Sequence, residues 1–245
     1  MGARLSSLTS GELQAVGAAV LLIPLGATEQ HGPHLQLGTD TDIATAWAER
    51  TVESLNDRAP IEKALNGETL NAVIAPPLPY GSSGEHQAFP GTLSIGQEAL
   101  ELVIIELIRS AANDFTKMVL LSGHGGNLQP VERAVERLVA EGHDALHLFP
   151  TWSPAEASSI DAHAGRTETS IMLHLHPDTV RTERLAPGQT KSLSELMPTL
   201  MSHGISAVAP SGVLGDPTKA TELEGRQLLD TLVAKTVDVI LGQNR

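Results

Sequence analysis

The amino-acid sequence predicts an α/β fold in which a mostly parallel central sheet lies between two layers of helices, in a single α/β/α domain spanning residues 1–245. Short apolar runs of strand length alternate with longer segments of helical period. The apolar runs are continuous, which is typical of parallel strands buried on both faces. No linker rich in Ser or Pro divides the 245 residues, and a chain of this length can bury one large core.

The elements justify this fold in order along the chain. The predicted strands are AAVLLIPLG (18–26), NAVIAPPLP (71–79), KMVLLSG (117–123) and ALHLFP (145–150). The predicted helices are DIATAWAERTVESLN (42–56), QEALELVIIELIRSAAND (97–114), LQPVERAVERLVAEG (128–142) and KATELEGRQLLDTLVAKTVDVILG (219–242). A strand followed by a helix and a further strand is the unit from which parallel sheets are built.

Composition excludes several classes of function. The formal net charge is -13, with 29 acidic and 16 basic residues, so we expect no general affinity for nucleic acid or anionic membranes. The absence of cysteine excludes disulfides and thiolate sites, and any metal must be held by His, Asp or Glu. No apolar stretch approaches the roughly 20 residues that span a bilayer, and we expect a cytoplasmic protein.

Polar motifs follow the apolar runs, where the ligand sites of parallel sheets are found. After the first run, Glu29 and His31 are two residues apart, so an extended backbone would point both side chains the same way. Gly32 and Pro33 then turn the chain toward Asp40, which precedes a predicted helix. Asp40 is either the N-cap of that helix or, with Glu29 and His31, a ligand of Zn, Mn or Fe.

Two later motifs contribute further candidate ligands. GHGGN (123–127) places His124 at a strand end, as a structural histidine or a ligand. DAHAGRTETS (161–170) contains His163, a candidate general acid or base near neutral pH. In the same motif, Thr167 or Glu168 opens a helix. Glu168 is either a favourable first-turn carboxylate or another metal ligand.

The remaining polar loop and histidines carry less information. GSSGEHQAFPGT (81–92) places Glu85 and His86 in a solvated loop or one that faces the substrate. The other histidines lack comparable neighbours and are interpreted as surface or core residues: His34, His143, His147, His174, His176 and His203. The phosphate-loop and GxSxG motifs are absent. Hydrolysis by a metal-activated water is therefore the chemistry that the residues favour.

Five successive motifs resemble those of the creatininase family of metal-dependent amidohydrolases. They are EQHGPHLQLGTD, YGSSGEHQAFPGT, GHGGN, HAGRTETS and GVLGDPTKAT, in the family's order and spacing from about Leu21 to Gly225. The segment from His176 to Thr221 is most similar to the mycofactocin-system branch. This resemblance implies a peptidase that removes a C-terminal Val-Tyr portion from a modified, ribosomally made precursor peptide during maturation of a redox cofactor.

The resemblance also implies a metal centre. Glu29, His31, Asp40 and His124 match the family's ligand positions, and Asp40 matches the carboxylate that bridges two divalent ions. The ions are Zn, Fe or Mn, with Zn or Fe favoured. His163 matches the position proposed as the acid or base that moves a proton to the leaving amine.

One departure from the family pattern bears on the second ion. Creatininase proper has a glutamate two residues after the histidine of GHGGN, where this chain has Gly126. The second ion must therefore be completed by another group, for which Glu168 is the candidate, and creatinine is disfavoured as the substrate.

Substrate contacts and assembly are expectations of the same kind. Glu85, His86 and Trp152 are candidates to line the substrate cleft, and backbone N–H groups of Gly125 and Gly126 are candidates to hold the oxyanion. The resemblance implies a homo-oligomer, of which a hexamer is one form. Two alternatives stay open: a cyclic amide or formamide hydrolase acting on a small molecule, and a catalytically silent metal-binding scaffold.

Overall fold

A four-stranded parallel sheet lies at the centre of the protein. The computed structural model describes residues 4–17, 19–66, 71–150 and 161–242. The strands are β1 (Val20–Leu25), β2 (Ala72–Ile74), β3 (Lys117–Ser122) and β4 (Ala145–Leu148). Their order across the sheet is β2-β1-β3-β4, and every adjacent pair is parallel. The predicted parallel sheet is therefore confirmed.

The strand β2 is shorter than the predicted run 71–79 because three prolines interrupt it. Pro76, Pro77 and Pro79 have no N–H group to donate to a neighbouring strand. The chain still follows β1 beyond the strand, since the N–H of Leu78 donates to the Pro24 carbonyl at 2.9 Å. The polar loop that follows is thereby kept beside the end of β1.

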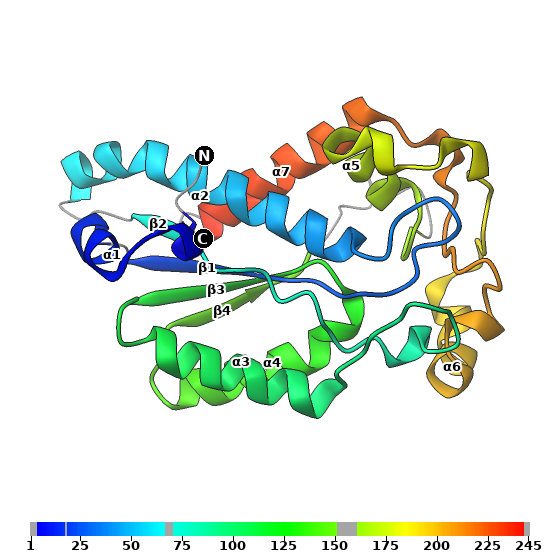
Figure 1. Cartoon of the computed structure of the whole chain (residues 1–245), viewed down its shortest axis with the longest axis horizontal. Helices are drawn as coiled ribbons and strands as arrows, with labels where there is room; N and C mark the ends of the chain where they lie inside the picture. Colours follow the sequence, from blue (N-terminus) through cyan, green and yellow to red (C-terminus); the bar gives the residue numbers. More distant parts are fainter. Residues whose placement is uncertain (1–3, 18, 67–70, 151–160, 243–245) are drawn as a thin grey trace.

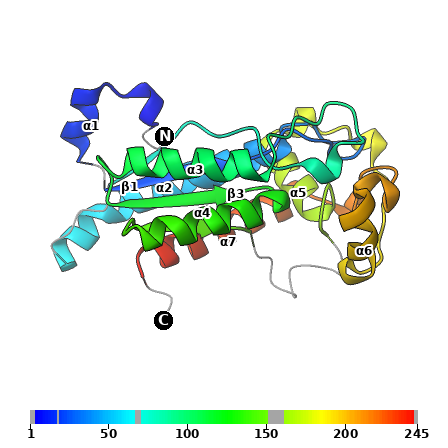
Figure 2. The same cartoon turned by 90° about the horizontal axis from the view of Figure 1, so that it is seen from below.

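Alternate side chains of β1 enter two different apolar layers. Leu21 and Ile23 pack with the buried residues of α3 (Gln97–Ala111) and α4 (Leu128–Ala140). Val20 and Leu22 pack with α2 (Thr39–Asn66) and α7 (Glu222–Ile240). Because neighbouring residues of a strand face opposite sides of the sheet, one strand serves both cores. Figures 1 and 2 show α2 and α7 on one face and α3 and α4 on the other, which confirms the three layers.

The helices differ from the predicted ones mainly at their ends. The first predicted helix, 42–56, runs from Thr39 to Asn66 in the structure. Three further helices are present: α1 (Ser10–Val16), α5 (Arg166–Leu175) and α6 (Leu193–His203). Two of them, α1 and α6, were not predicted, although both begin with a capping box, Thr9 with Glu12 and Ser192 with Glu195. No helix in the described ranges has the length and apolar composition needed to cross a bilayer.

The order of the strands determines where a site can form. The chain leaves β1 for β2 on one side and then returns past β1 to β3 on the other side. The loops after β1 and β3 therefore diverge at the carboxyl edge of the sheet. This reversal point is where ligands bind in open α/β sheets.

Candidate metal centre

The five predicted metal ligands come together at the carboxyl ends of β1 and β3. Together with His163, the predicted acid or base, their ligand atoms fall into three overlapping groups, each with all atoms within 4.8 Å of one another. The groups are Glu29, Asp40 and His124; His31, Asp40 and Glu168; and Glu29, His31 and His163. We refer to these six residues as the carboxylate–imidazole cluster. Residues more than 130 positions apart in the sequence thus meet at the reversal point of the sheet.

Asp40 is the residue that the first two groups share. Its Oδ1 lies 3.0 Å from Nε2 of His31, and its Oδ2 lies 3.5 Å from Nδ1 of His124. The helix α2 begins at Thr39, so Asp40 lies inside the first turn. The N-cap interpretation of Asp40 is therefore wrong, and its carboxylate instead offers one oxygen to each group.

A tight turn brings Glu29 and His31 back toward α2. Gly32 has a φ of 63°, a left-handed conformation that glycine adopts without strain. A side chain at this position would also meet Val213, whose Cγ2 lies 2.6 Å from the place of a Cβ. The N–H of Glu29, before the turn, donates to the carbonyl of Leu37, after the turn, at 3.1 Å. The loop is closed on itself with both side chains inside the cluster.

Backbone carbonyls determine which nitrogen of each imidazole carries a proton. A carbonyl can only accept a hydrogen bond. Nδ1 of His31 donates to the Glu29 carbonyl at 3.2 Å, Nε2 of His124 to the Ser82 carbonyl at 3.1 Å, and Nε2 of His163 to the Gln30 carbonyl at 2.7 Å. The other nitrogen of each ring faces the carboxylates. In their neutral forms, these rings direct lone pairs toward carboxylate oxygens.

This arrangement fits a cation between the rings and the carboxylates. Both carboxylate oxygens of Glu29 and the Oδ2 of Asp40 are buried without a hydrogen bond. Nδ1 of His124 lies 3.2 Å from Oε1 of Glu29, a close approach that still lacks hydrogen-bond geometry. Buried carboxylates without donors are costly unless a positive charge compensates them. The mixed nitrogen and oxygen donors suit divalent Zn, Mn or Fe.

Without a metal, the imidazoles compensate the carboxylates by holding protons. Burial acts to lower the pKa of His31, but the adjacent Asp40 outweighs it and raises that pKa to about 10. Burial likewise opposes a charge on His124, and Glu29 raises its pKa to about 10. Burial acts to raise the pKa of Glu29, but the imidazoles around it, His124 foremost, lower it. A metal ion would displace these protons.

Glu168 approaches the cluster from the first turn of α5. Its Oε2 accepts a hydrogen bond from the N–H of Ala164 at 2.6 Å, and burial raises its pKa to about 7. Ala164 has a φ of 49°, which is uncommon for a residue with a side chain. This turn directs His163 and Glu168 to the same cluster. The two readings of Glu168, as a first-turn carboxylate and as a cluster member, are therefore compatible.

His86 lies inside the protein instead of lining an open cleft. It is 2% exposed, and its Nε2 lies 3.1 Å from Oε1 of Glu29. Its Nδ1 accepts from the side-chain amide of Gln30 at 2.9 Å. This hydrogen bond leaves the proton of His86 on Nε2, facing Glu29. His86 thus lies beside a carboxylate of the cluster, and the solvated-loop interpretation of this residue is wrong.

Sequence reasoning missed two residues that hold the site together. Gln30 is buried between Glu29 and His31, and its amide also donates to the Gly212 carbonyl at 3.1 Å. Asn127 accepts the N–H of Ser82 at 2.9 Å and donates to the Gly26 carbonyl at 3.0 Å. The amide of Asn127 thus ties the loops after β1 and β2 to the loop after β3. The polar Asn at the end of GHGGN was the available signal.

The remaining predicted site residues lie around the cluster. Oε1 of Glu85 is 3.5 Å from Nε2 of His124, and burial raises the pKa of Glu85. Gly125 and Gly126 form a 3-10 turn, Gly125–Asn127, between His124 and α4. Trp152 lies outside the described residues. His34, interpreted from the sequence as a surface or core histidine, is buried, and its Nε2 contacts the Thr169 hydroxyl at 2.9 Å.

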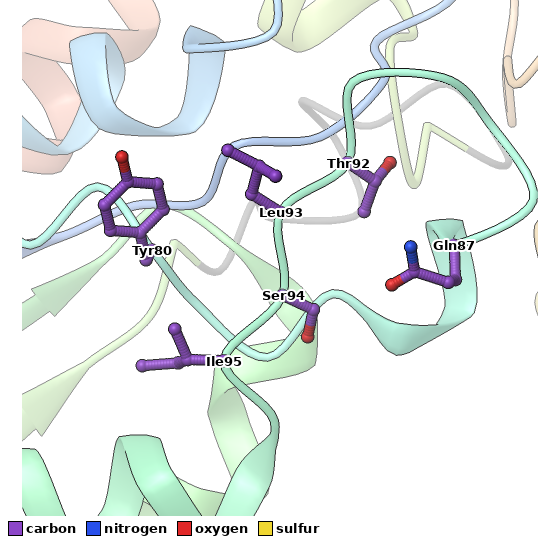
Figure 3. A pocket seen from close by; sticks show the side chains of 6 residues that line it. All are labelled: Tyr80, Gln87, Thr92, Leu93, Ser94 and Ile95. Carbon is purple, nitrogen blue, oxygen red and sulfur yellow. The ribbon is translucent and has the colours of Figure 1, made fainter.

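A separate pocket of about 370 Å³ lies on the loop between β2 and α3. Figure 3 shows its lining residues, which are Tyr80, Gln87, Thr92, Leu93, Ser94 and Ile95. The three large apolar residues among them are exposed. None of the six belongs to the carboxylate–imidazole cluster. The loop that carries His86 inward therefore carries an open, partly apolar surface on its other side.

A family model and a curated relative both match nearly the whole chain. Residues 6–240 match the family model described as creatininase, creatinine amidohydrolase. The chain is 46% identical over 236 residues to a mycofactocin precursor peptide peptidase of Mycolicibacterium smegmatis, with 96% of this chain and 90% of the relative covered.

Two solved creatininase structures share the fold. One, of the Zn-Zn type, matches with a TM-score of 0.78 at 26% identity and covers 99% of this chain and 98% of the other. The second, described as creatininase Mn, matches with a TM-score of 0.78 at 26% identity and covers 99% of both chains.

Proposed function

This chain belongs to the creatininase family, and from that premise we propose that it is a metal-dependent peptidase that removes a C-terminal Val-Tyr portion from a modified precursor peptide. The observation that carries the proposal is the position of Asp40, whose two buried oxygens face two different groups of donors. A shared carboxylate of this kind can hold two divalent ions side by side. The similarity to a precursor peptide peptidase over 96% of the chain supports the substrate class.

Five residues of the cluster would divide between two ions. Glu29, Asp40 and His124 would hold one ion, and His31, Asp40 and Glu168 the other. We favour Zn or Fe, with Mn as the further option, because each group includes an imidazole nitrogen, which suits Zn and Fe, whereas Mn prefers oxygen ligands. When bound, such ions supply a water of lowered pKa and polarise the scissile carbonyl.

His163 is suited to move the proton that the leaving amine requires. Its Nε2 is held by the Gln30 carbonyl, so Nδ1 is the nitrogen free to accept and release a proton. This Nδ1 lies 3.7 Å from Oε1 of Glu29, inside the cluster. Burial is the main cause that lowers the pKa of His163 well below its ordinary value, which favours a neutral ring able to act first as a base.

Backbone N–H groups of the Gly125–Asn127 turn are suited to bind the oxyanion. They follow His124 directly and precede the N-terminus of α4, where a helix favours negative charge. Gly125 and Gly126 would hold the oxyanion that forms during attack. We further propose a cytoplasmic homo-oligomer of one-domain subunits, with a hexamer as the form to test first by size-exclusion chromatography with light scattering.

The experiment is an incubation of the metal-loaded protein with the modified precursor peptide. Mass spectrometry of the products is expected to show the peptide shortened at its C-terminus together with a Val-Tyr dipeptide. Release of formate from a formylamino-pyrimidine, without peptide cleavage, would favour a small-molecule amide hydrolase. Bound metal with no turnover of either substrate would indicate a silent scaffold and would overturn the proposal.

A further inference from the structure

Gly126 lies where no side chain can be accommodated. A Cβ at this position would lie 2.2 Å from the Ser82 carbonyl oxygen and 2.5 Å from both Oε1 of Glu85 and Nε2 of His124. The neighbouring Gly125 differs, because a Cβ there would meet only the Phe149 ring within 4 Å, at 3.9 Å. The space beside Gly126 is thus filled by groups from the loop that precedes α3.

These groups surround the nitrogen of His124 that faces away from the cluster. Nδ1 of His124 faces Glu29 and Asp40, at 3.2 Å and 3.5 Å from their oxygens. Nε2 donates to the Ser82 carbonyl at 3.1 Å, and Oγ of Ser83 at 3.4 Å and Oε1 of Glu85 at 3.5 Å lie beside it. Glu85 belongs to none of the donor groups found among the described residues. It therefore contacts His124 on the side opposite to the cluster and is outside the proposed ligand set.

The position of Glu85 is constrained by the structure on both sides. It lies in the 3-10 turn Gly84–His86, and the next residue, His86, is buried against Glu29. On its other side, Gly204 at the end of α6 comes close to the Glu85 carbonyl, which would be only 2.8 Å from a Cβ at 204. The side chain of Glu85 is 27% exposed. A closely packed backbone therefore presents a partly exposed carboxylate to His124.

We propose that Glu85 is a positioning residue of the metal centre. With the Ser82 carbonyl, it holds the Nε2–H of His124, so that Nδ1 stays turned toward Glu29 and Asp40. A carboxylate beside the second nitrogen of a histidine ligand raises the basicity of the first and fixes the orientation of the ring. The inference rests on the proposed role of His124 as a ligand, and it gives Glu85 a task other than lining the substrate cleft.

Zinc binding tests the inference without any substrate. We expect Glu85→Leu to raise the Zn²⁺ dissociation constant roughly 10- to 100-fold, measured by competition with a chromophoric chelator. Glu85→Gln keeps an oxygen beside Nε2 and loses only the charge, so its effect should be smaller. The d–d absorption of the Co²⁺-loaded protein should shift in Glu85→Leu, because the orientation of His124 changes. Glu98, an exposed carboxylate of α3, offers the matched control Glu98→Leu, which should leave both measurements unchanged.

The two adjacent glycines offer a second test. Gly126→Ala should weaken Zn²⁺ binding because its Cβ displaces Glu85 or His124, whereas Gly125→Ala should bind Zn²⁺ as the unmodified protein does. Circular dichroism of the metal-free variants checks that they fold. Unchanged Zn²⁺ affinity and Co²⁺ spectrum in a folded Glu85→Leu variant would overturn the positioning role.

The variant His124→Ala distinguishes a wrong role for Glu85 from a wrong assignment of the metal ligands. If His124→Ala loses Zn²⁺ and Glu85→Leu does not, only the role of Glu85 is overturned. If His124→Ala retains both ions, the metal centre as assigned is overturned as well.

Discussion

Glu29 and Glu141 are both surrounded by basic side chains, yet their environments differ in kind. At the surface, Glu141 receives both Arg109 and Arg137, at 2.6 Å and 3.1 Å, and hydrogen bonds from Arg109 lower the pKa of Glu141 to about 2. Guanidinium groups keep their charge at any ordinary pH. The surface carboxylate is therefore fully compensated by protein and water.

The buried carboxylates have only imidazoles beside them. Among the described residues, every ion pair of Glu29 and Asp40 involves a histidine. An imidazole is positive only while it holds two protons, and it can give one up to a metal. The surface network thus carries its own permanent positive charges, whereas the cluster is arranged so that a cation can replace protons.

Asp40→Asn is the change that should distinguish the two regions most strongly. The substitution removes the shared negative charge and replaces one of the two carboxylate oxygens with an NH2 group, which cannot act as a ligand. We expect the metal content to fall below two ions per subunit and kcat/KM to fall by roughly 10³-fold or more, the equivalent of several kcal/mol. Metal analysis with steady-state kinetics measures both, and full turnover with two ions retained would disprove the bridging role.

His163→Asn should affect the reaction with little effect on the metal. Transfer of a proton by a positioned side chain contributes roughly 10²- to 10⁴-fold to a rate, so we expect kcat to fall within that range. The metal content should stay at two ions, because His163 is outside the two groups that share Asp40. A loss of metal in this variant would instead make His163 a ligand.

Glu168→Gln should remove one ion selectively. Its carboxylate belongs only to the group with His31 and Asp40, so we expect one tightly bound ion per subunit and a second with weakened affinity. Titration followed by metal analysis gives the stoichiometry. An unchanged value of two would remove Glu168 from the ligand set and leave the second site without a carboxylate of its own.

Metal binding should release protons from the cluster. The pKa values of His31 and His124 are raised to about 10 without metal, so both rings are protonated near pH 7.5. Binding of two ions should therefore release about two protons per subunit, or slightly more because the pKa of Glu168 is about 7. Calorimetry in buffers of different ionisation enthalpy measures this number, and a value near zero would contradict the protonated metal-free cluster.

The same raised pKa values determine the pH dependence of the metal-free protein. A histidine whose pKa is higher in the folded state stabilises that state fully below its unfolded pKa of about 6.5 and loses the contribution as pH rises through about 10. The stability of the metal-free protein should therefore decrease across that window. The metal-loaded protein should lack this decrease.

Arg109→Ala should have the smallest effect. It removes the surface partner of Glu106 and Glu141, and exposed ion pairs contribute little to stability. We expect unchanged metal content and kcat, with a slight decrease in Tm that high salt diminishes. A large loss of metal in this variant would show that the two regions are coupled.

The sequence predicted the strands better than the ends of the helices. Continuous apolar runs identify β1 and β3 because both faces of a parallel strand are buried. The apolar pattern of 71–79 overstated β2, since pattern alone does not weigh the missing N–H groups of three prolines. The helices α1 and α6 were not predicted, because their short lengths give too few turns for a periodic signal. The single-domain organisation of residues 1–245 stays a prediction.

By itself, the sequence indicated the α/β class, the family and the residues proposed for the metal centre, because each depends on local apolar runs and motifs. Only the tertiary structure decided that Asp40 lies between two groups of donors. It also placed His86 beside the carboxylate of Glu29, and Glu85 beside the nitrogen of His124 that faces away from the cluster. These relations join loops far apart in the chain. They depend on how the ends of β1, β2 and β3 lie side by side at one edge of the sheet. No local pattern of residues encodes the distances between side chains on different loops.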